Sequence, residues 1–401
     1  MHYHVTLHYV TIHHVTPHHA TMYLLEHDAK ELLAQHGISV PHGRLIGRND
    51  TIDRHVLPAG PWMVKGQIAA GGRGKIGLVK KAESWQEIST QLQAMLGAAV
   101  GGGLVGAVRV EQQVKAAHEA YIGFLLDAAS GGVRVILSDS GGMDVEQVPR
   151  DRIHSAVAAP EVRDLVECVR KLAVNLPGDI SKAVVDAGEK LVPAFLELEA
   201  VLVEINPLFV LESGGWIAGD AKVITDDNAL PRQRALESLV KTRVADYADV
   251  ARKHEHGFDY VEVDPAGEIG LLTTGAGLSM MLIDELRAAG LKPFNFLDIR
   301  TGGLRGETKR LTQVLQWIGA GKKVKVLLVN IFAGITDLGE FSRLLVTALE
   351  TAHVRMPVVA RLVGTNLSAA REVLAPAGIP LHTDLDAALD AVRKHLGKGD
   401  E

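Results

Sequence analysis

Residues 269–277 read IGLLTTGAG, an apolar run that ends in a glycine-containing turn. Residues 278–289 then carry apolar side chains at helical spacing, and this alternation continues toward the end of the chain. Further apolar runs lie at 294–299, 324–331, 357–363 and 379–382, separated or followed by helical patterns at 307–318, 339–351, 368–375 and 385–396. Continuously apolar strands that alternate with helices predict a parallel sheet with helices on both faces. We therefore expect five strands in a doubly wound, flavodoxin-like α/β fold.

The turns after the first three of these runs all contain glycine. They are residues 274–277, 300–303 and 332–335. In doubly wound sheets, ligands bind beyond the carboxyl ends of the strands. The sequence thus predicts a ligand site at this edge of the sheet.

The chain before residue 267 lacks this regular alternation of strand and helix patterns. From Met22 to about residue 250, helical and strand patterns mix without a clean repeat, and the polar stretch 248–264 is typical of a connector. We place one domain at 22–255 and a second at 256–401. Residues 1–21 hold seven of the 18 histidines and neither Lys nor Arg, which excludes a signal peptide and favours an expression leader or tag over a native metal-binding tract.

Composition excludes several classes of protein. The chain has 401 residues, and 42 basic residues against 48 acidic ones give a net charge of −6, which argues against a nucleic-acid partner. Cys168 is the single cysteine, so a disulfide framework is excluded and a reducing, cytoplasmic setting fits best. Apolar stretches are too short or too rich in glycine to predict a membrane span.

A basic, glycine-rich segment follows the predicted strand 62–65. Lys65 ends that strand, and residues 71–75 read GGRGK. Glycines let the backbone approach a phosphate closely, while Lys65, Arg73 and Lys75 supply positive charge. The spacing differs from that of a Walker A loop, and the motif alone leaves a flexible basic surface loop as the alternative.

A second candidate site lies at a predicted hairpin. Glu204 and Asn206 sit two residues apart on the strand 201–207 and therefore share a face, and the returning strand 216–223 brings Asp220 beside them. Carboxylate and amide oxygens suit Mg²⁺, which takes its remaining ligands from water and nucleotide phosphates. The alternative is a solvated hairpin face. Lys222 is either a further phosphate contact or a surface lysine.

Two acids between these segments are candidates for nucleoside binding. Glu111 ends an apolar strand where an adenine would meet a hinge, and Glu119 could hold the ribose or a metal-bound water.

Taken together, these motifs resemble the β subunits of succinate–CoA ligases and, more broadly, the ADP-forming carboxylate–CoA ligases that include malate–CoA ligase. The resemblance covers residues 22 to about 398. It is carried, in order along the chain, by residues 26–33, 60–65, 71–75, 141–144, 204–208, 275–278, 329–335 and 364–366.

The resemblance implies an ATP-grasp domain followed by a flavodoxin-like ligase domain. It implies that Lys65 and the turn Gly72, Arg73 and Gly74 hold the phosphates of ATP, that Glu111 and Glu119 contact the nucleoside, and that Asn206 and Asp220 hold Mg²⁺. The family reaction forms an acyl-CoA from a small carboxylic acid through a phosphohistidine. That histidine and most of the CoA site lie on an α subunit, which we expect as the partner of this chain.

The chain departs from the family pattern at the expected acid site. Thr274 stands before Gly275 where the family commonly has Asn, and Arg300 precedes a turn that is usually three glycines. The stretch after Gly334 and Ile335 also differs, since residues 336–339 replace the usual Arg-Cys-Asp. Arg300 and Arg305 either clamp a second carboxylate or are surface charges.

We therefore predict an ADP-forming ligase in which Thr274, Gly275, Arg300, Gly334 and Ile335 contact the acid. Succinate, malate or a related acid, ATP or GTP, and a heterodimer or heterotetramer all remain open. The alternative within enzymes is an ATP-grasp carboxylate–amine or biotin-dependent ligase, which the predicted second domain disfavours. The alternative outside catalysis is a regulatory subunit that binds nucleotide.

Overall fold

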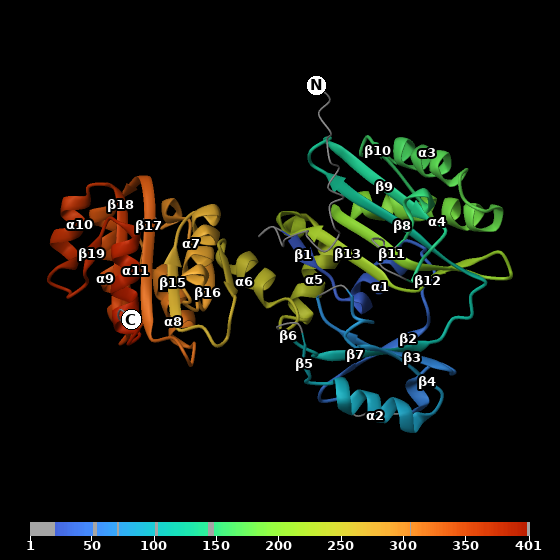
Figure 1. The fold of residues 1–401 in the computed structure, drawn as a ribbon, viewed down its shortest axis with the longest axis horizontal. Helices are drawn as coiled ribbons and strands as arrows, with labels where there is room; N and C mark the ends of the chain where they lie inside the picture. The colour runs from blue at the N-terminus through green and yellow to red at the C-terminus, as the bar shows by residue number, and fades with distance from the viewer. Residues whose placement is uncertain are drawn as a thin grey trace. The chain divides into compact units, whose positions relative to one another are not determined.

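A computed structural model describes residues 21–50, 54–69, 72–100, 103–142, 148–304 and 306–398, which fold into two compact units (Figure 1). The first unit ends at Thr242 and the second begins at Arg243. This division precedes the expected connector, because helix α6 (Ala248–His256) packs against strand β14 (Asp259–Glu262) of the second unit. Of the predicted leader, 1–20 lie outside the described residues, and Thr21 opens strand β1.

Among its described residues, the first unit contains two larger antiparallel sheets and a two-stranded antiparallel pair, β5 and β6. Its strands are β1 (Thr21–Tyr23), β2 (Gly43–Gly47), β3 (Trp62–Gln67), β4 (Val79–Ala82), β5 (Ala99–Val100), β6 (Gly103–Leu104), β7 (Ala107–Gln112), β8 (His118–Asp127), β9 (Gly132–Ser138), β10 (Ile153–Ala158), β11 (Ala200–Val210), β12 (Trp216–Ala218) and β13 (Ala221–Asp226). Its helices are α1 (Glu26–Gln35), α2 (Trp85–Met95), α3 (Val162–Ala173), α4 (Gly178–Glu197) and α5 (Arg234–Thr242).

Helices cover each of the two larger sheets, and α1 connects these sheets. The larger sheet has the order β1-β13-β11-β8-β9-β10 with β12 beside β11, and α3 and α4 pack on it. The smaller sheet, β2-β7-β3-β4, is covered by α2, whose N-cap Ser84 accepts a hydrogen bond from Glu87 N (3.3 Å). Figure 1 shows α1 between the two sheets, where Lys30 contacts a residue of β7 and the turn before β13.

The predicted strand 216–223 is interrupted at Gly219 and Asp220. The carbonyl of Gly219 accepts hydrogen bonds from the Nζ atoms of Lys30 and Lys65, each at 2.8 Å. A side chain at Gly219 would also collide with the ring of Phe209, because its Cβ would lie 2.3 Å from that ring. The sequence pattern missed this break because the bonds that cause it come from distant parts of the chain.

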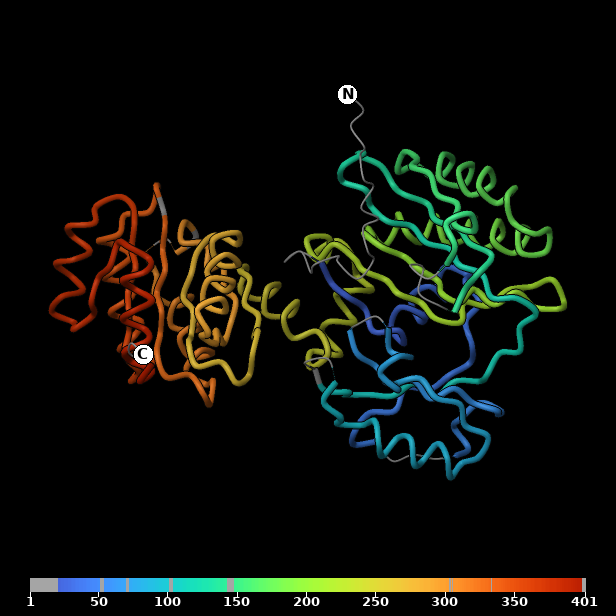
Figure 2. The backbone as a smooth tube through the Cα atoms, viewed as in Figure 1, coloured from blue at the N-terminus to red at the C-terminus, as the bar shows by residue number. Residues whose placement is uncertain are grey.

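The second unit alternates strands and helices, a path that Figure 2 follows as a tube. Besides α6 and β14, its elements are β15 (Ile269–Thr273), α7 (Ala276–Ala288), β16 (Asn295–Asp298), α8 (Lys309–Gly319), β17 (Val326–Asp337), α9 (Leu338–Thr351), β18 (Val358–Thr365), α10 (Leu367–Leu374), β19 (Leu381–His382) and α11 (Leu385–His395).

The parallel sheet has four backbone-paired strands instead of the five that we expected. These are β15-β17-β18-β19, while β16 pairs antiparallel with β14. The buried amide of Asn295 nevertheless ties β16 to β15, donating to Leu271 O (2.9 Å) and accepting from Leu271 N (2.8 Å). With β16 beside β15, the spatial order is 2-1-3-4-5, the flavodoxin-like order.

Buried side chains form a core on each face of this sheet. One core joins the sheet to α8, α9 and α10, and the other joins it to α7 and α11. Successive residues of β17 alternate between them, since Leu327 and Val329 belong to the first core and Leu328 to the second. The doubly wound fold is therefore confirmed. No helix among the residues described is long and apolar enough to cross a membrane.

Candidate nucleotide and metal site

Lys65 and Arg73, the predicted phosphate-binding cations, lie in one buried cluster of charges. Lys65 Nζ, on β3, is 2.8 Å from Glu26 Oε1 and 2.7 Å from Glu111 Oε1. Arg73 Nη1 is 2.7 Å from Glu26 Oε2, and its Nη2 is 2.6 Å from Asp220 Oδ2. Burial by itself would lower the pKa of Lys65, but Glu111 and Glu26 raise it, so this side chain stays cationic.

The glycine turn around Arg73 is a series of tight backbone bonds. Lys75 N donates to Gly72 O and Leu78 N donates to Arg73 O, both at 3.0 Å. Gly72 has φ +70°, a left-handed conformation that favours glycine, and a Cβ at Gly72 or Gly74 would meet nothing within 4 Å. The backbone is therefore open at these two positions. Gly71 lies outside the described residues.

The two predicted nucleoside contacts have different surroundings. Glu111 is buried, and its carboxylate receives hydrogen bonds from Lys30 Nζ (2.8 and 3.0 Å) and Arg109 Nε (2.7 Å) besides its ion pair with Lys65. Glu119 is exposed on β8, although partial burial raises the pKa of its carboxyl group. The structure thus places Glu111 in contact with Lys65, one of the predicted phosphate-binding cations, and Glu119 beside Gly142, where a Cβ would lie 2.1 Å from Glu119 Oε2.

The predicted metal ligands meet at the strand pair β11 and β13. Asn206 N donates to Asp220 O (3.3 Å), and the Asn206 side chain hydrogen-bonds to Glu204 while its Oδ1 accepts from Gly142 N (2.8 Å). Glu204 pairs in register with Lys222 of β13, and its Oε2 is buried without a hydrogen-bond partner. Burial raises the pKa of Glu204 and lowers that of Lys222, whose Nζ lies over the ring of Tyr23.

This donor set fits Mg²⁺ in its chemistry. It offers two carboxylates and an amide oxygen, and the unpartnered Glu204 Oε2 is a buried acceptor available to a cation. Within the described ranges there is no group of three or more His, Cys, Asp or Glu side chains placed to hold a metal ion. Asp220 is also paired with Arg73, so metal binding there requires the guanidinium to release the carboxylate.

In the second unit, Asp298 joins two of the predicted acid-binding turns. Its Oδ1 accepts from Gly275 N (2.8 Å) and from Arg300 N (3.2 Å). Thr301 connects these turns further, since its N–H donates to Thr274 Oγ1 (3.4 Å) and its hydroxyl contacts Thr336 Oγ1 (2.9 Å). Residues 332–335, which we expected to form a turn, belong instead to β17, whose pairing with β18 is irregular between Ala333 and Asp337. The turns after β15 and β16 are therefore held together with the carboxyl end of β17 at this edge of the sheet.

The predicted acid contacts differ in what their side chains offer. The Arg300 guanidinium binds Asp259 (3.0 Å), a carboxylate that also pairs with Lys253 (2.9 Å), and Arg305 lies outside the described residues. Gly334 O accepts from Thr365 Oγ1 (2.9 Å), and Ile335 is 97% exposed. Arg300 is thus engaged in an internal ion pair, whereas Ile335 presents an apolar surface.

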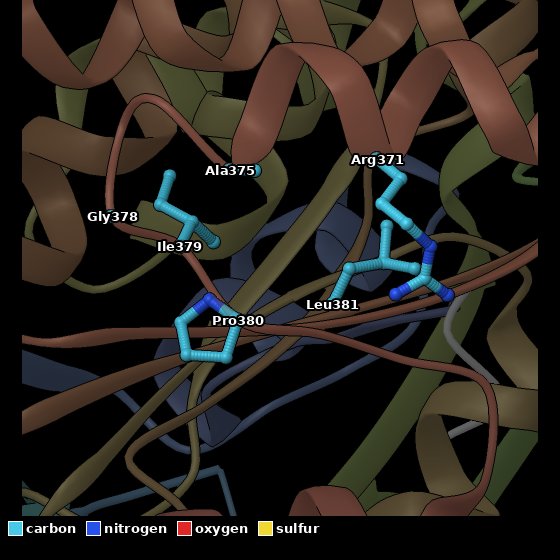
Figure 3. Close-up of a pocket in the computed structure, with 6 residues that line it drawn as sticks. All are labelled: Arg371, Ala375, Gly378, Ile379, Pro380 and Leu381. Carbon is cyan, nitrogen blue, oxygen red and sulfur yellow. The ribbon is translucent and has the colours of Figure 1, made fainter.

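An open depression on the second unit lies away from these turns. It is lined by Arg371, Ala375, Gly378, Ile379, Pro380 and Leu381 (Figure 3). These residues surround the end of α10 and the start of β19, and strand starts lie at the opposite edge of a parallel sheet from the ligand-binding turns. The depression contains none of the predicted site residues.

Comparison with known proteins identifies the family. Residues 23–210 match the ATP-grasp domain and residues 272–394 match the CoA-ligase domain. The β subunit of the ADP-forming succinate–CoA ligase of Ignicoccus hospitalis is 34% identical over 379 residues, covering 93% of this chain and 99% of that protein. This chain belongs to the succinate–CoA ligase β-subunit family.

Other relatives of this family agree. The ADP-forming β subunit of Chloroflexus aurantiacus is 36% identical over 387 residues (94% of this chain, all of that protein), and the GDP-forming β subunit of Thermus thermophilus is 35% identical over 379 residues (92% and 97%). The ATP citrate lyase of Methanothrix soehngenii has the same fold, with a TM-score of 0.68 at 20% identity over 94% of this chain and all of that one. The resemblance and the two-domain fold class inferred from the sequence are confirmed.

Sequence reasoning missed three members of the charge cluster, namely Glu26, Lys30 and Arg109. All are buried, with exposed fractions of 3%, 0% and 1%. Glu26 and Lys30 lie four residues apart in a helical pattern, a spacing that places them on one face of a helix. That spacing was visible in the sequence, but it does not reveal that this face is buried.

Proposed function

We propose that this chain is the nucleotide-binding β subunit of an ADP-forming carboxylate–CoA ligase. It acts with an α subunit, which carries the histidine that is phosphorylated and most of the CoA site. The overall reaction joins a small carboxylic acid to CoA as nucleoside triphosphate is cleaved. Family membership and the geometry of the first unit support this assignment.

The observation that carries the proposal is the meeting of Lys65, Arg73 and Asp220 at one place. These residues come from β3, the glycine turn and the turn before β13, and they contact one another directly or through Glu26. A lysine and an arginine beside a carboxylate can hold a triphosphate and its divalent cation together. In this assignment Lys65, Arg73 and the open backbone at Gly72 and Gly74 bind the phosphates.

Glu204, Asn206 and Asp220 are the residues proposed to hold Mg²⁺. The bound ion would supply positive charge that neutralises the phosphate oxygens. Arg73 moves from Asp220 to the phosphates as they enter, so the guanidinium and carboxylate exchange partners. Glu119, exposed on β8, is assigned to the nucleoside end of the site, whereas Glu111, which was predicted to contact the nucleoside, is assigned to holding the phosphate-binding Lys65.

The acid site is assigned to the linked turns of the second unit. Thr274, Gly275, Arg300, Gly334 and Ile335 lie at the carboxyl edge of the parallel sheet or directly beside it. Thr274 offers a hydroxyl where the family commonly has an amide, and Arg300 is held by Asp259. We therefore assign the substrate class as small carboxylic acids, with succinate and malate as its first candidates.

The test is CoA-dependent release of nucleoside diphosphate, ADP from ATP or GDP from GTP, by this chain assembled with its α subunit. Succinate, malate, glutarate, itaconate and citrate are supplied in turn, with ATP or GTP. Turnover with one acid supports the ligase and identifies its substrate. Tight MgATP binding without turnover on any acid would instead support a regulatory subunit.

A further inference from the structure

Glu26 lies between the two proposed phosphate-binding cations. Its Oε1 is 2.8 Å from Lys65 Nζ and its Oε2 is 2.7 Å from Arg73 Nη1. Its side chain is 1% exposed, so a nucleotide bound at the surface of the cluster would not reach it readily. One carboxylate of α1 therefore fixes the separation of a strand lysine and a loop arginine.

Lys30 balances this carboxylate and links it to the metal side of the site. Its Nζ lies 2.6 Å from Glu26 Oε1, 2.8 Å from Glu111 Oε2 and 2.8 Å from Gly219 O. Gly219 immediately precedes Asp220, the proposed metal ligand. The pair Glu26 and Lys30 thus connects the phosphate-binding cations to the turn that carries Asp220.

Glu26 is suited to hold Arg73 after that residue has left Asp220. Arg73 is held by two carboxylates, of which Asp220 is 32% exposed and Glu26 is almost fully buried. When Asp220 turns to a cation, Glu26 remains as the carboxylate that orients the guanidinium. Burial would raise the pKa of Glu26, but Arg73, Lys30 and Lys65 keep it well below its ordinary value.

We infer that Glu26 is a positioning residue that aligns Lys65 and Arg73 for the phosphates of the nucleotide, with Lys30 as its charge-balancing partner. This inference rests on the proposed function. It assigns α1 a role in nucleotide use that is separate from its packing. The binding energy that Lys65 and Arg73 contribute depends steeply on their geometry. Losing their alignment should therefore weaken the binding of ATP more than the binding of CoA or the acid.

The test removes the pair without changing the net charge of the cluster. Glu26→Gln alone would leave buried cations uncompensated, which strongly destabilises a fold. The double variant Glu26→Gln with Lys30→Met removes one charge of each sign and keeps similar side-chain volumes. Glu31→Gln is the matched control, because Glu31 lies on the same helix, is 55% exposed and contacts Arg109 at 3.4 Å.

Each variant is assembled with the α subunit, and kcat and KM are measured for ATP, CoA and the acid. We expect the double variant to raise the KM for ATP about tenfold and to leave the KM values for CoA and the acid within about twofold, with Glu31→Gln unchanged. A folded double variant whose KM for ATP stays within about twofold of wild type overturns the inference.

A second variant decides the matter if the double variant does not fold. Glu26→Asp keeps the charge but shortens the side chain, so it cannot span both cations. We expect it to fold and to raise the KM for ATP, and an unchanged KM for ATP overturns the inference. If wild type itself uses no nucleotide, the proposed function fails. If wild type uses nucleotide and the variants have the same KM for ATP, only the positioning role of Glu26 fails.

Discussion

Arg73 and Asp220 form a two-point ion pair, in which Nη2 of the guanidinium lies 2.8 Å from Oδ1 and 2.6 Å from Oδ2 of the carboxylate. One of these residues is the proposed phosphate ligand and the other a proposed metal ligand. Each therefore satisfies the charge of the other. Metal and triphosphate binding should be coupled, because each ligand releases the group that the other needs.

Free Mg²⁺ should bind this chain weakly, because it must displace Arg73 from Asp220. Arg73→Met removes the competitor and should raise the affinity for Mn²⁺, used as a spectroscopic probe without nucleotide, by about tenfold. Arg152→Met is the control, since Arg152 pairs with Asp139 at an exposed position. Equal Mn²⁺ affinity in wild type and Arg73→Met would show that the ion pair does not guard the metal site.

Asp220→Ala should abolish Mg²⁺-dependent nucleotide use and leave the fold intact. The side chain of Asp220 is partly exposed, and Arg73 keeps its ion pair with Glu26 when Asp220 is removed. Nucleotide cleavage in the assembled enzyme and circular dichroism check the two halves of this prediction. Glu212→Ala, at the exposed turn after β11, should change neither. Full activity in Asp220→Ala would remove Asp220 from the metal site.

Stability should fall at acid pH through Glu26 and Glu111. Burial would raise the pKa of each, but Arg73, Lys30 and Lys65 lower the pKa of Glu26 in the folded chain, and Lys30, Lys65 and Arg109 lower that of Glu111. Their contribution is complete above the ordinary glutamate pKa of 4.5 and is lost as pH falls below it toward the folded-state values. Urea unfolding from pH 7 to below 4.5 measures this loss. The loss should be smaller in the Glu26→Gln, Lys30→Met double variant, and an identical pH profile would contradict the assignment.

Asn295→Leu should destabilise the second unit by about 2–5 kcal/mol, because it leaves the buried N–H and C=O of Leu271 without partners. The free energy of unfolding in urea, followed by a probe on the second unit, gives the value. Asn175→Leu, which removes an exposed side-chain bond at the end of α3, should stay within about 0.5 kcal/mol of wild type. A change of that size in Asn295→Leu would mean that the Asn295 amide adds little to the backbone hydrogen bonds that join the two ends of β16 to β15, Phe294 N to Ile269 O and Ile299 N to Thr273 O.

Much of the fold and part of the site could be predicted from local patterns. The alternation of apolar runs and helices in 267–396 predicts parallel strands. The spacing of Glu204, Asn206 and Asp220 on a hairpin places these residues together, because strand periodicity and a short turn depend on only a few neighbouring residues. The side-chain link through Asn295 was not predicted. An apolar strand pattern leads one to expect hydrogen bonds between the backbones of neighbouring strands, and it gives no sign that a side chain makes them.

The charge cluster could not be predicted in full because its contacts span the first unit. Lys30 and the carbonyl of Gly219 are 189 residues apart, and Lys65 and Arg73 meet Asp220 only through the packing of α1 between two sheets. A charged residue on a helix is ordinarily expected to face solvent. Only the structure shows that Glu26 and Lys30 turn inward, where several opposite charges compensate them.

The measurement that tests the central claim most directly is the transfer of labelled γ-phosphate from ATP to the α subunit in the presence of this chain. The account predicts that the α subunit is labelled only when this chain and Mg²⁺ are both present, and that Asp220→Ala prevents the labelling. An unlabelled α subunit, with MgATP demonstrably bound to this chain, would contradict it.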